Sequence, residues 1–205
     1  GYWLVASDGG VFSFGDASFY GSEGARHLNA PIVGIASTPD QKGYWLVASD
    51  GGVFSFGDAS FYGSMGARHL NKPVVGMAAT PDGRGYWLVA SDGGVFSFGD
   101  ASFAGSMGGK HLNEPVVGMA SVVSGAGYWL VASDGGIFNF GAGGFAGSMG
   151  GKHLNAPIVA MAGPAGGPGY WLAGSDGGVF AFGPPFSGSA ADLALAAKVV
   201  GMAST

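Results

Sequence analysis

Four short segments of the chain place a cation, an imidazole and an amide side chain within four residues. They share the pattern Arg/Lys-His-Leu-Asn, and their histidines follow one another at intervals of 42 residues. Such groups can form hydrogen bonds with the hydroxyl and amide groups of a sugar or another small polar ligand. The candidate ligand-binding residues are Arg26, His27, Asn29, Arg68, His69, Asn71, Lys110, His111, Asn113, Lys152, His153 and Asn155.

The same residues do not predict a metal site or an active site. Zinc needs three or four ligands about 2 Å from one point, whereas each segment carries a single histidine. An active site needs unlike groups gathered locally, and no segment adds an acid, base or nucleophile that the others lack. We therefore predict no catalytic residue, no metal and no cofactor. A structural alternative for each histidine is that its imidazole bonds a nearby carbonyl and fixes the segment.

The four segments belong to a repeat that runs through the whole chain. The string GYWL begins at Gly1, Gly43, Gly85, Gly127 and Gly169, so each copy starts 42 residues after the previous one. The first three copies are nearly identical, the fourth drifts, and the fifth is a residue shorter. Such a period indicates an architecture built from one supersecondary module.

Each copy is expected to form four short antiparallel strands. Apolar, β-branched and aromatic runs alternate with Gly, Asp, Ser and Pro, and no helical period is present. The strands expected in the first copy are residues 2–7, 11–14, 19–22 and 32–37. The glycines of the Asp8-Gly9-Gly10 turn suit a tight hairpin between the first two. Four such strands are typical of one blade of a β-propeller.

The five copies predict an all-β, five-bladed β-propeller with four antiparallel strands per blade, forming a single domain over residues 1–205. The chain ends with Val199-Val200-Gly201-Met202-Ala203, the run that precedes GYWLVAS in every complete copy. Residues 198–205 are therefore expected to complete the first blade and remove both open sheet edges. We expect a closed monomer in which the VVGMA runs are innermost, because their glycines permit close backbone approach.

Several repeated residues are assigned structural roles. The SDGG aspartates are expected to accept hydrogen bonds from backbone amides two residues on; they are Asp8, Asp50, Asp92, Asp134 and Asp176. Asp16, Asp58 and Asp100, in the next turn, are predicted to do the same. The tryptophan of each GYWL string, together with Phe12 and Phe14 and their copies, is expected to pack between neighbouring blades.

Composition limits the kinds of partner. The net charge is −5 and the eight Lys and Arg residues are scattered, so the basic stripe of a nucleic-acid binder is absent. No apolar run reaches the roughly 18 residues of a membrane span. The chain has no cysteine, which excludes disulfides and thiolate metal sites. Because residue 1 already lies inside a repeat, we expect that the native N-terminus has been removed.

Two long phrases, GYWLVASDGGVFSFGDASFYGS and LNKPVVGMAATPDGRGYWLVA, resemble a repeat of actinobacterial secreted and cell-wall proteins. The resemblance covers the whole chain and implies a secreted or cell-wall location, often beside a separate hydrolase domain. The expected architecture is also similar to that of tachylectin-2-like propellers, which are five-bladed and bind sugars between blades. The lectin's own motifs are absent, so this second likeness transfers no residues.

Strand order places the HLN connector, the stretch before each VVGMA run, on the same face as the SDGG turn. We expect four similar shallow sites there, one per HLN connector; the fifth copy reads Asp192-Leu193-Ala194-Leu195-Ala196 and should lack one. The predicted function is a non-catalytic, lectin-like module that recognises a glycan or cell-wall polymer with avidity. The alternative is a protein–protein interaction scaffold or an accessory domain of a larger secreted hydrolase.

Overall fold

A computed structural model describes residues 1–204, and Thr205, the last residue of the expected closing strand, lies outside the described residues. All regular secondary structure in the described chain is β. The chain divides into two compact units, residues 1–90 with 96–101, and residues 91–95 with 102–205. The single domain over 1–205 stays a prediction.

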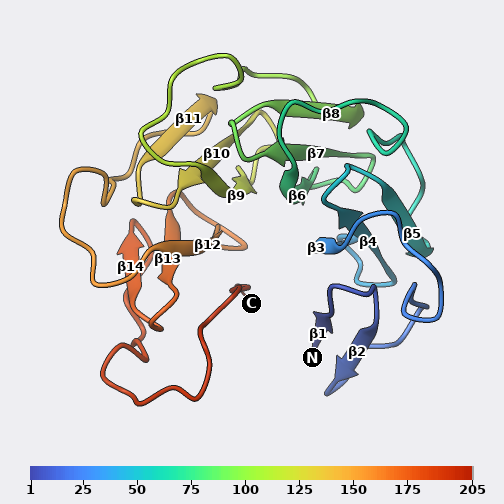
Figure 1. Cartoon of the computed structure of the whole chain (residues 1–205), viewed down its shortest axis with the longest axis horizontal. Coiled ribbons are helices and arrows are strands. Elements are labelled where there is room, and N and C mark those ends of the chain that lie inside the picture. The colour runs from blue at the N-terminus through green and yellow to red at the C-terminus, as the bar shows by residue number, and fades with distance from the viewer. Residues whose placement is uncertain (205) are drawn as a thin grey trace. The chain divides into compact units, whose positions relative to one another are not determined.

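The first unit contains a two-stranded sheet, β1-β2, and two three-stranded sheets, β3-β4-β5 and β6-β7-β8 (Figure 1). Each sheet comes from consecutive antiparallel strands, as expected for blades. The strands are β1 (Tyr2–Val5), β2 (Val11–Phe14), β3 (Ile32–Ser37), β4 (Gly43–Ala48), β5 (Val53–Gly57), β6 (Val74–Ala79), β7 (Gly85–Ala90) and β8 (Val95–Gly99). The first residue of β8 is counted with the second unit.

The second unit contains two three-stranded sheets of the same order, β9-β10-β11 and β12-β13-β14. Their strands are β9 (Val116–Ser121), β10 (Gly127–Ala132), β11 (Ile137–Gly141), β12 (Ile158–Ala162), β13 (Tyr170–Gly174) and β14 (Val179–Phe182). In every three-stranded sheet the GYWL strand is central, with the VVGMA-type strand on one side and the VFSF-type strand on the other. The register Trp45↔Ser55 recurs as Trp129↔Asn139.

The prediction of four strands per blade is wrong, because a complete blade has three. Residues 19–22, the expected third strand, are not in a ladder, and neither are their copies. Side chains from the GYWL strands hold this outer segment instead. Trp45 Nε1 donates to the Ser60 carbonyl (2.7 Å), while Tyr86 Oη donates to the Gly63 carbonyl (2.6 Å) and accepts from the Tyr62 amide (3.2 Å). Backbone groups that a fourth strand would pair are thus already bonded.

Neighbouring blades pack through the aromatic residues of the GYWL strands. Every residue of β4 and β7 is buried, since both faces of these central strands are covered. The Trp45 and Tyr86 ring centroids lie 5.6 Å apart, and both side chains are inaccessible to solvent. The same contact recurs in the second unit between Trp129 and Tyr170, at 5.4 Å. The expected position between blades is confirmed for Trp3, Trp45 and Trp129.

The VVGMA-type strands of adjacent blades also approach closely. A Cβ added at Gly34 of β3 would lie 3.2 Å from Val47 Cγ1 and 3.8 Å from Gly76 Cα of β6. Glycine therefore provides room here for the backbone of the next blade, as predicted.

The predicted closure is not confirmed. β1 has β2 as its one ladder partner, and residues 198–204 form no strand. Val199 nevertheless donates its amide to the Ser175 carbonyl (3.0 Å), as Ile32 donates to Ser7 (2.8 Å) at the start of β3. The closing segment therefore begins in the place that a VVGMA strand takes in earlier repeats.

The two sets of turn aspartates behave differently. Each SDGG aspartate accepts the amide of the residue two positions on, at 2.8–3.0 Å, which confirms that prediction. The prediction for the second turn is wrong. Asp58 Oδ1 lies 3.1 Å from Thr38 Oγ1 of the preceding TPDQ loop, and Asp100 interacts with Thr80 and Asp82 of the next such loop. The carboxylates of the second turn therefore join loops instead of capping their own turn.

Candidate functional site

The HLN connector and the SDGG turn lie at the same end of each blade, which we call the connector end. Within the first repeat, the Glu23 amide donates to the Gly9 carbonyl (2.9 Å), and the Ile32 amide donates to Ser7 (2.8 Å). The second turn and the loop after the VVGMA strand lie together at the opposite end, because Thr38 of that loop contacts Asp58 of the turn. The predicted separation of the two sets of loops is confirmed for the individual blades.

The connectors of repeats 1, 3 and 4 are also bonded to the SDGG turn of the following repeat. The Ser49 amide donates to the Pro31 carbonyl at 2.9 Å. Equivalent bonds join Ser133 to Pro115 and Ser175 to Pro157, both at 2.9 Å. The connector of one repeat and the hairpin of the next therefore form one structural feature, and a pocket lies between them.

Pocket A, in the first unit, is an open cavity of about 340 Å³. It is formed by the connector of repeat 1, the hairpin of repeat 2 and Gly66. The connector contributes Glu23, Arg26, His27, Leu28, Asn29 and Ala30, and the hairpin contributes Ala48, Asp50, Gly52 and Phe54. Three predicted site residues, Arg26, His27 and Asn29, thus line a single pocket.

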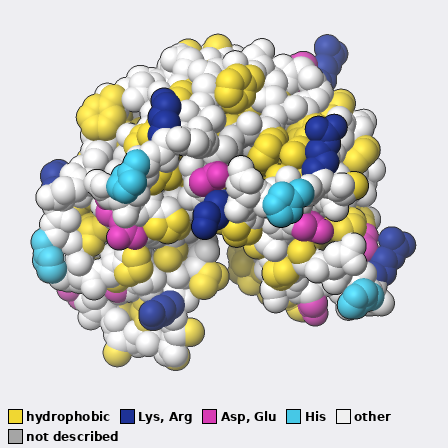
Figure 2. All heavy atoms as spheres, turned by 45° about the horizontal axis from the view of Figure 1, so that its top comes forward, with side chains coloured by type: hydrophobic (Ala, Val, Ile, Leu, Met, Phe, Trp, Pro, Cys, Tyr) yellow, Lys and Arg dark blue, Asp and Glu magenta, His cyan; other side chains and the backbone are white. Residues whose placement is uncertain are grey.

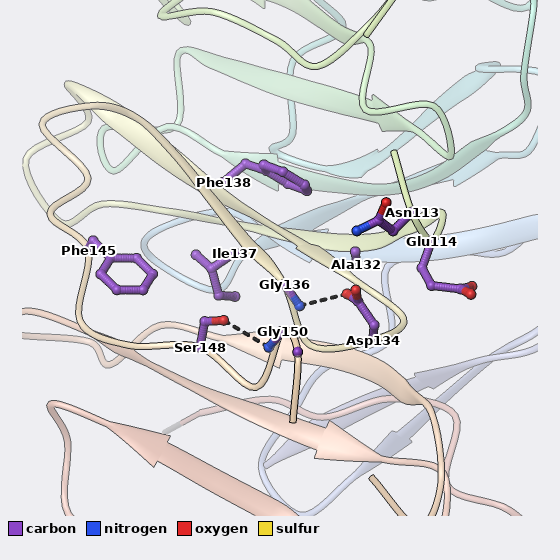
Figure 3. A pocket seen from close by; sticks show the side chains of 11 residues that line it. Asn113, Glu114, Ala132, Asp134, Gly136, Ile137, Phe138, Phe145, Ser148 and Gly150 are labelled. Atoms are coloured by element: carbon purple, nitrogen blue, oxygen red, sulfur yellow. Dashed lines mark hydrogen bonds between the residues drawn. The ribbon is translucent and has the colours of Figure 1, made fainter. Parts of the chain in front are cut away.

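Pocket B, in the second unit, is an open cavity of about 380 Å³ (Figure 3). Its lining residues are Asn113 and Glu114 from the connector of repeat 3, with Ala132, Asp134, Gly136, Ile137, Phe138, Phe145, Ser148, Gly150 and Gly151 from repeat 4. Six of them stand two repeats, or 84 residues, after residues of pocket A: Asn29/Asn113, Ala48/Ala132, Asp50/Asp134, Gly52/Gly136, Phe54/Phe138 and Gly66/Gly150. The repeat therefore builds the same pocket at least twice.

The two pockets share six equivalent lining positions but differ in charge. In pocket A, Arg26 Nη1 lies 3.5 Å from Oε1 of Glu23, a carboxylate that is 5% exposed. Both linings contain two carboxylates, Glu23 and Asp50 in pocket A and Glu114 and Asp134 in pocket B, but the lining of pocket B includes no Lys or Arg. Asp134 Oδ1 accepts the Gly136 amide at 2.8 Å, and Glu114 Oε2 accepts Ser133 Oγ at 3.2 Å.

The twelve predicted site residues are all exposed at the surface. Of those outside pocket A, Asn113 lines pocket B, and the remaining eight line neither pocket. His, Lys and Arg side chains stand out separately from the surface in Figure 2. Within residues 1–204 none of the four imidazoles has a hydrogen-bond partner, so the structural alternative of an imidazole fixed by a local carbonyl is not found.

Sequence reasoning missed the aromatic and acidic walls of the pockets. The sequence assigns Asp50 and Asp134 to the turn alone, and Phe54 and Phe138 to the packing between blades. The turn role is confirmed for both aspartates, and all four residues also line a pocket. The available signal was the expected position of the SDGG turn beside the connector, which brings these residues to the same end.

The opposite end of the third blade holds a pair of carboxylates. Partial burial and the nearby charge of Asp82 raise the pKa of Asp100. The Thr80 hydroxyl and the Arg84 amide lower the pKa of Asp82. In the described part of the chain, no three His, Asp or Glu side chains gather as metal ligands, and no helix could cross a membrane.

No protein-family model and no curated protein match the sequence. Among solved structures, the chain is similar to the β-propeller domain of Cps50 (Swd1) from Myceliophteria thermophila, with a TM-score of 0.52 and 11% identity. The match covers 74% of this chain and 51% of that chain, so the chain spans about half the length of that structure. The likeness and the repeated antiparallel sheets show an all-β fold built from β-propeller blades.

Proposed function

We propose that this chain is a non-catalytic interaction module that binds a protein partner at the connector end. The observation that carries the proposal is the repetition of one pocket, since pockets A and B are built from equivalent residues of consecutive repeats. Both are open and combine a phenylalanine ring with an amide and a carboxylate. Surface side chains of a bound segment could enter such pockets, and loops on a rigid scaffold are a common place for binding groups.

A glycan or cell-wall polymer is the second candidate ligand. Pocket A favours it, because Arg26, His27 and Asn29 stand beside Phe54 and offer hydrogen-bond groups next to an aromatic face. With this ligand, the module would serve as the accessory domain of a secreted or cell-wall hydrolase, as the repeat resemblance implies.

Selection of displayed random peptides on the purified chain tests the main proposal. We expect selected peptides to lose at least about fivefold in affinity, roughly 1 kcal/mol, in N29A or N113A, because each variant removes one amide from a pocket. Lys42→Ala, at the opposite end, is the control and should bind as the wild type does. No selected peptide, or peptides equally weakened by Lys42→Ala, would refute the proposal. Oligosaccharide-array binding that is sensitive to Asn29→Ala would then favour the glycan.

We also propose that residues 198–205 complete the first sheet, giving a closed, five-bladed monomer. The bond from Val199 to Ser175 supports this, because it matches the one that begins β3. The exposed apolar residues of the first sheet support it too: Tyr2 and Leu4 are 56% and 53% exposed, whereas their copies Tyr44 and Leu46 are fully buried.

A further inference from the structure

We propose that pocket B binds the side chain of a lysine or arginine presented by a protein partner. The inference rests on the proposed function and gives the chemistry of the partner. It follows from three features of the pocket: an acidic side, an apolar side, and a lining without Lys or Arg.

The acidic side consists of Asp134 and Glu114. The Asp134 carboxylate uses Oδ1 to accept the Gly136 amide, and Glu114 Oε2 accepts the Ser133 hydroxyl. A carboxylate has about four acceptor sites, so one such bond leaves capacity for a ligand. Asn113 adds an amide oxygen on the same side (Figure 3). These oxygens suit an ammonium or guanidinium group, which only donates.

The apolar side consists of Ile137, Phe138 and Phe145. In Figure 3 the Phe145 and Ile137 side chains lie away from the two carboxylates, with Gly136 and Gly150 between. Phe145 is 62% exposed, so its ring is available to a ligand. Lysine and arginine bury an aliphatic stem along apolar surface and keep the charged tip at a polar one. A cation near an aromatic face gains further stabilisation.

Pocket A acts as an internal control for charge. Its lining also has two carboxylates, Glu23 and Asp50, although Ala30 stands where pocket B has Glu114. Arg26 also lines pocket A and already supplies a cation there. An added cation should therefore prefer pocket B, and the preference should come from charge.

The test uses two peptides, acetyl-Ala-Lys-Ala-amide and its norleucine counterpart, added to the ¹⁵N-labelled chain. We expect the lysine peptide to bind with a millimolar Kd and to shift the amide signals of Gly136 and Gly150, leaving Gly52 and Gly66 unchanged. Glu114→Ala should weaken binding about 3- to 10-fold, or roughly 1 kcal/mol. The fold should tolerate this change, because Ala30 and Ala156 hold the equivalent positions.

Three results would overturn the inference: equal binding of the norleucine peptide, equal shifts in both pockets, or an affinity unchanged by Glu114→Ala. Failure of the lysine peptide, while displayed peptides still bind and still weaken in Asn113→Ala, would remove this inference and leave the proposed function standing. Failure of both assays would remove both. Shifts in both pockets with N,N′-diacetylchitobiose, and none with lysine, would assign the pockets to glycan instead.

Discussion

The first and second sheets carry the same GYWL sequence in opposite environments. In β4 every side chain is buried, whereas in β1 Tyr2 and Leu4 are more than half exposed. Both strands pair in the same way with the VFSF strand that follows. The difference lies in the covering side chains, because residues of the first repeat pack against β4.

The preceding repeat covers one face of each blade. Around Tyr44 and Leu46, the covering side chains come from the first repeat and include Trp3, Tyr20 and Leu28. A blade therefore does not bury its own GYWL strand, and two consecutive repeats form the cooperative unit, as in other repeat proteins. Substitutions at buried and exposed copies of the same residue test this dependence.

Leu46→Ala should destabilise the chain by about 2–5 kcal/mol, because it leaves a cavity at a fully buried site. Urea unfolding measures the loss, and Leu4→Ala is the matched variant in the first sheet. If residues 198–205 cover that sheet as proposed, Leu4→Ala should cost nearly as much. A cost below about 1 kcal/mol, typical of an exposed site, would mean that the first sheet stays open.

Tyr44→Phe should cost about 1–3 kcal/mol. The hydroxyl donates to the Gly21 carbonyl (2.6 Å) and accepts the Tyr20 amide (3.2 Å), so its removal leaves two backbone groups without their partner. Burial raises the pKa of Tyr44, in agreement with a desolvated hydroxyl. Thermal unfolding of Tyr44→Phe checks the cost. An unchanged Tm would show that this bond does not hold the outer segment.

Much of the blade could be predicted from the sequence, because strands and hairpin turns leave local patterns. The run Val11–Phe14 and the Asp8 turn occur as expected. The outer segment at 19–22 could not be assigned correctly, since its backbone bonds to Tyr and Trp side chains from other parts of the chain. A segment held by such bonds does not need the alternation of apolar and polar residues that marks a strand.

The candidate site could be predicted only in part. Arg26, His27 and Asn29 line one pocket because they share a connector, and a linear motif can show that. Phe138 and Asp134 join pocket B through the packing of one repeat against the next, which no local motif encodes. Their roles as ligand-binding residues stay predictions.

Ser55→Ala should leave stability unchanged or raise it by up to about 1 kcal/mol. Within the described chain, Ser55 Oγ is buried and has no hydrogen-bond partner, and Ser13 and Ser97 share this condition. The fifth repeat carries Ala181 at the equivalent position, paired with its tryptophan as Ser55 is. Urea unfolding measures the free energy of unfolding of this variant. A decrease of more than about 1 kcal/mol would indicate that the hydroxyl binds a water molecule that stabilises the blade.

Asp100→Asn should raise the Tm by about 1–2 °C at pH 7 and by less at pH 3.5. The pKa of Asp100 is raised in the folded state, so its ionised form is penalised above that pKa and the penalty disappears as the pH falls through it. Asn removes the repulsion from Asp82. A pH-independent effect would contradict the assignment.

A disulfide between positions 6 and 199 tests the proposal that the last segment covers the first blade. Ala48 and Ile32 are register partners in the second sheet, and Ala6 and Val199 are their counterparts, in a chain without cysteine. The double variant A6C/V199C should form an intrachain disulfide in dilute solution, as the control I32C/A48C does. Exclusive interchain dimers, or free thiols while the control oxidises fully, would contradict closure.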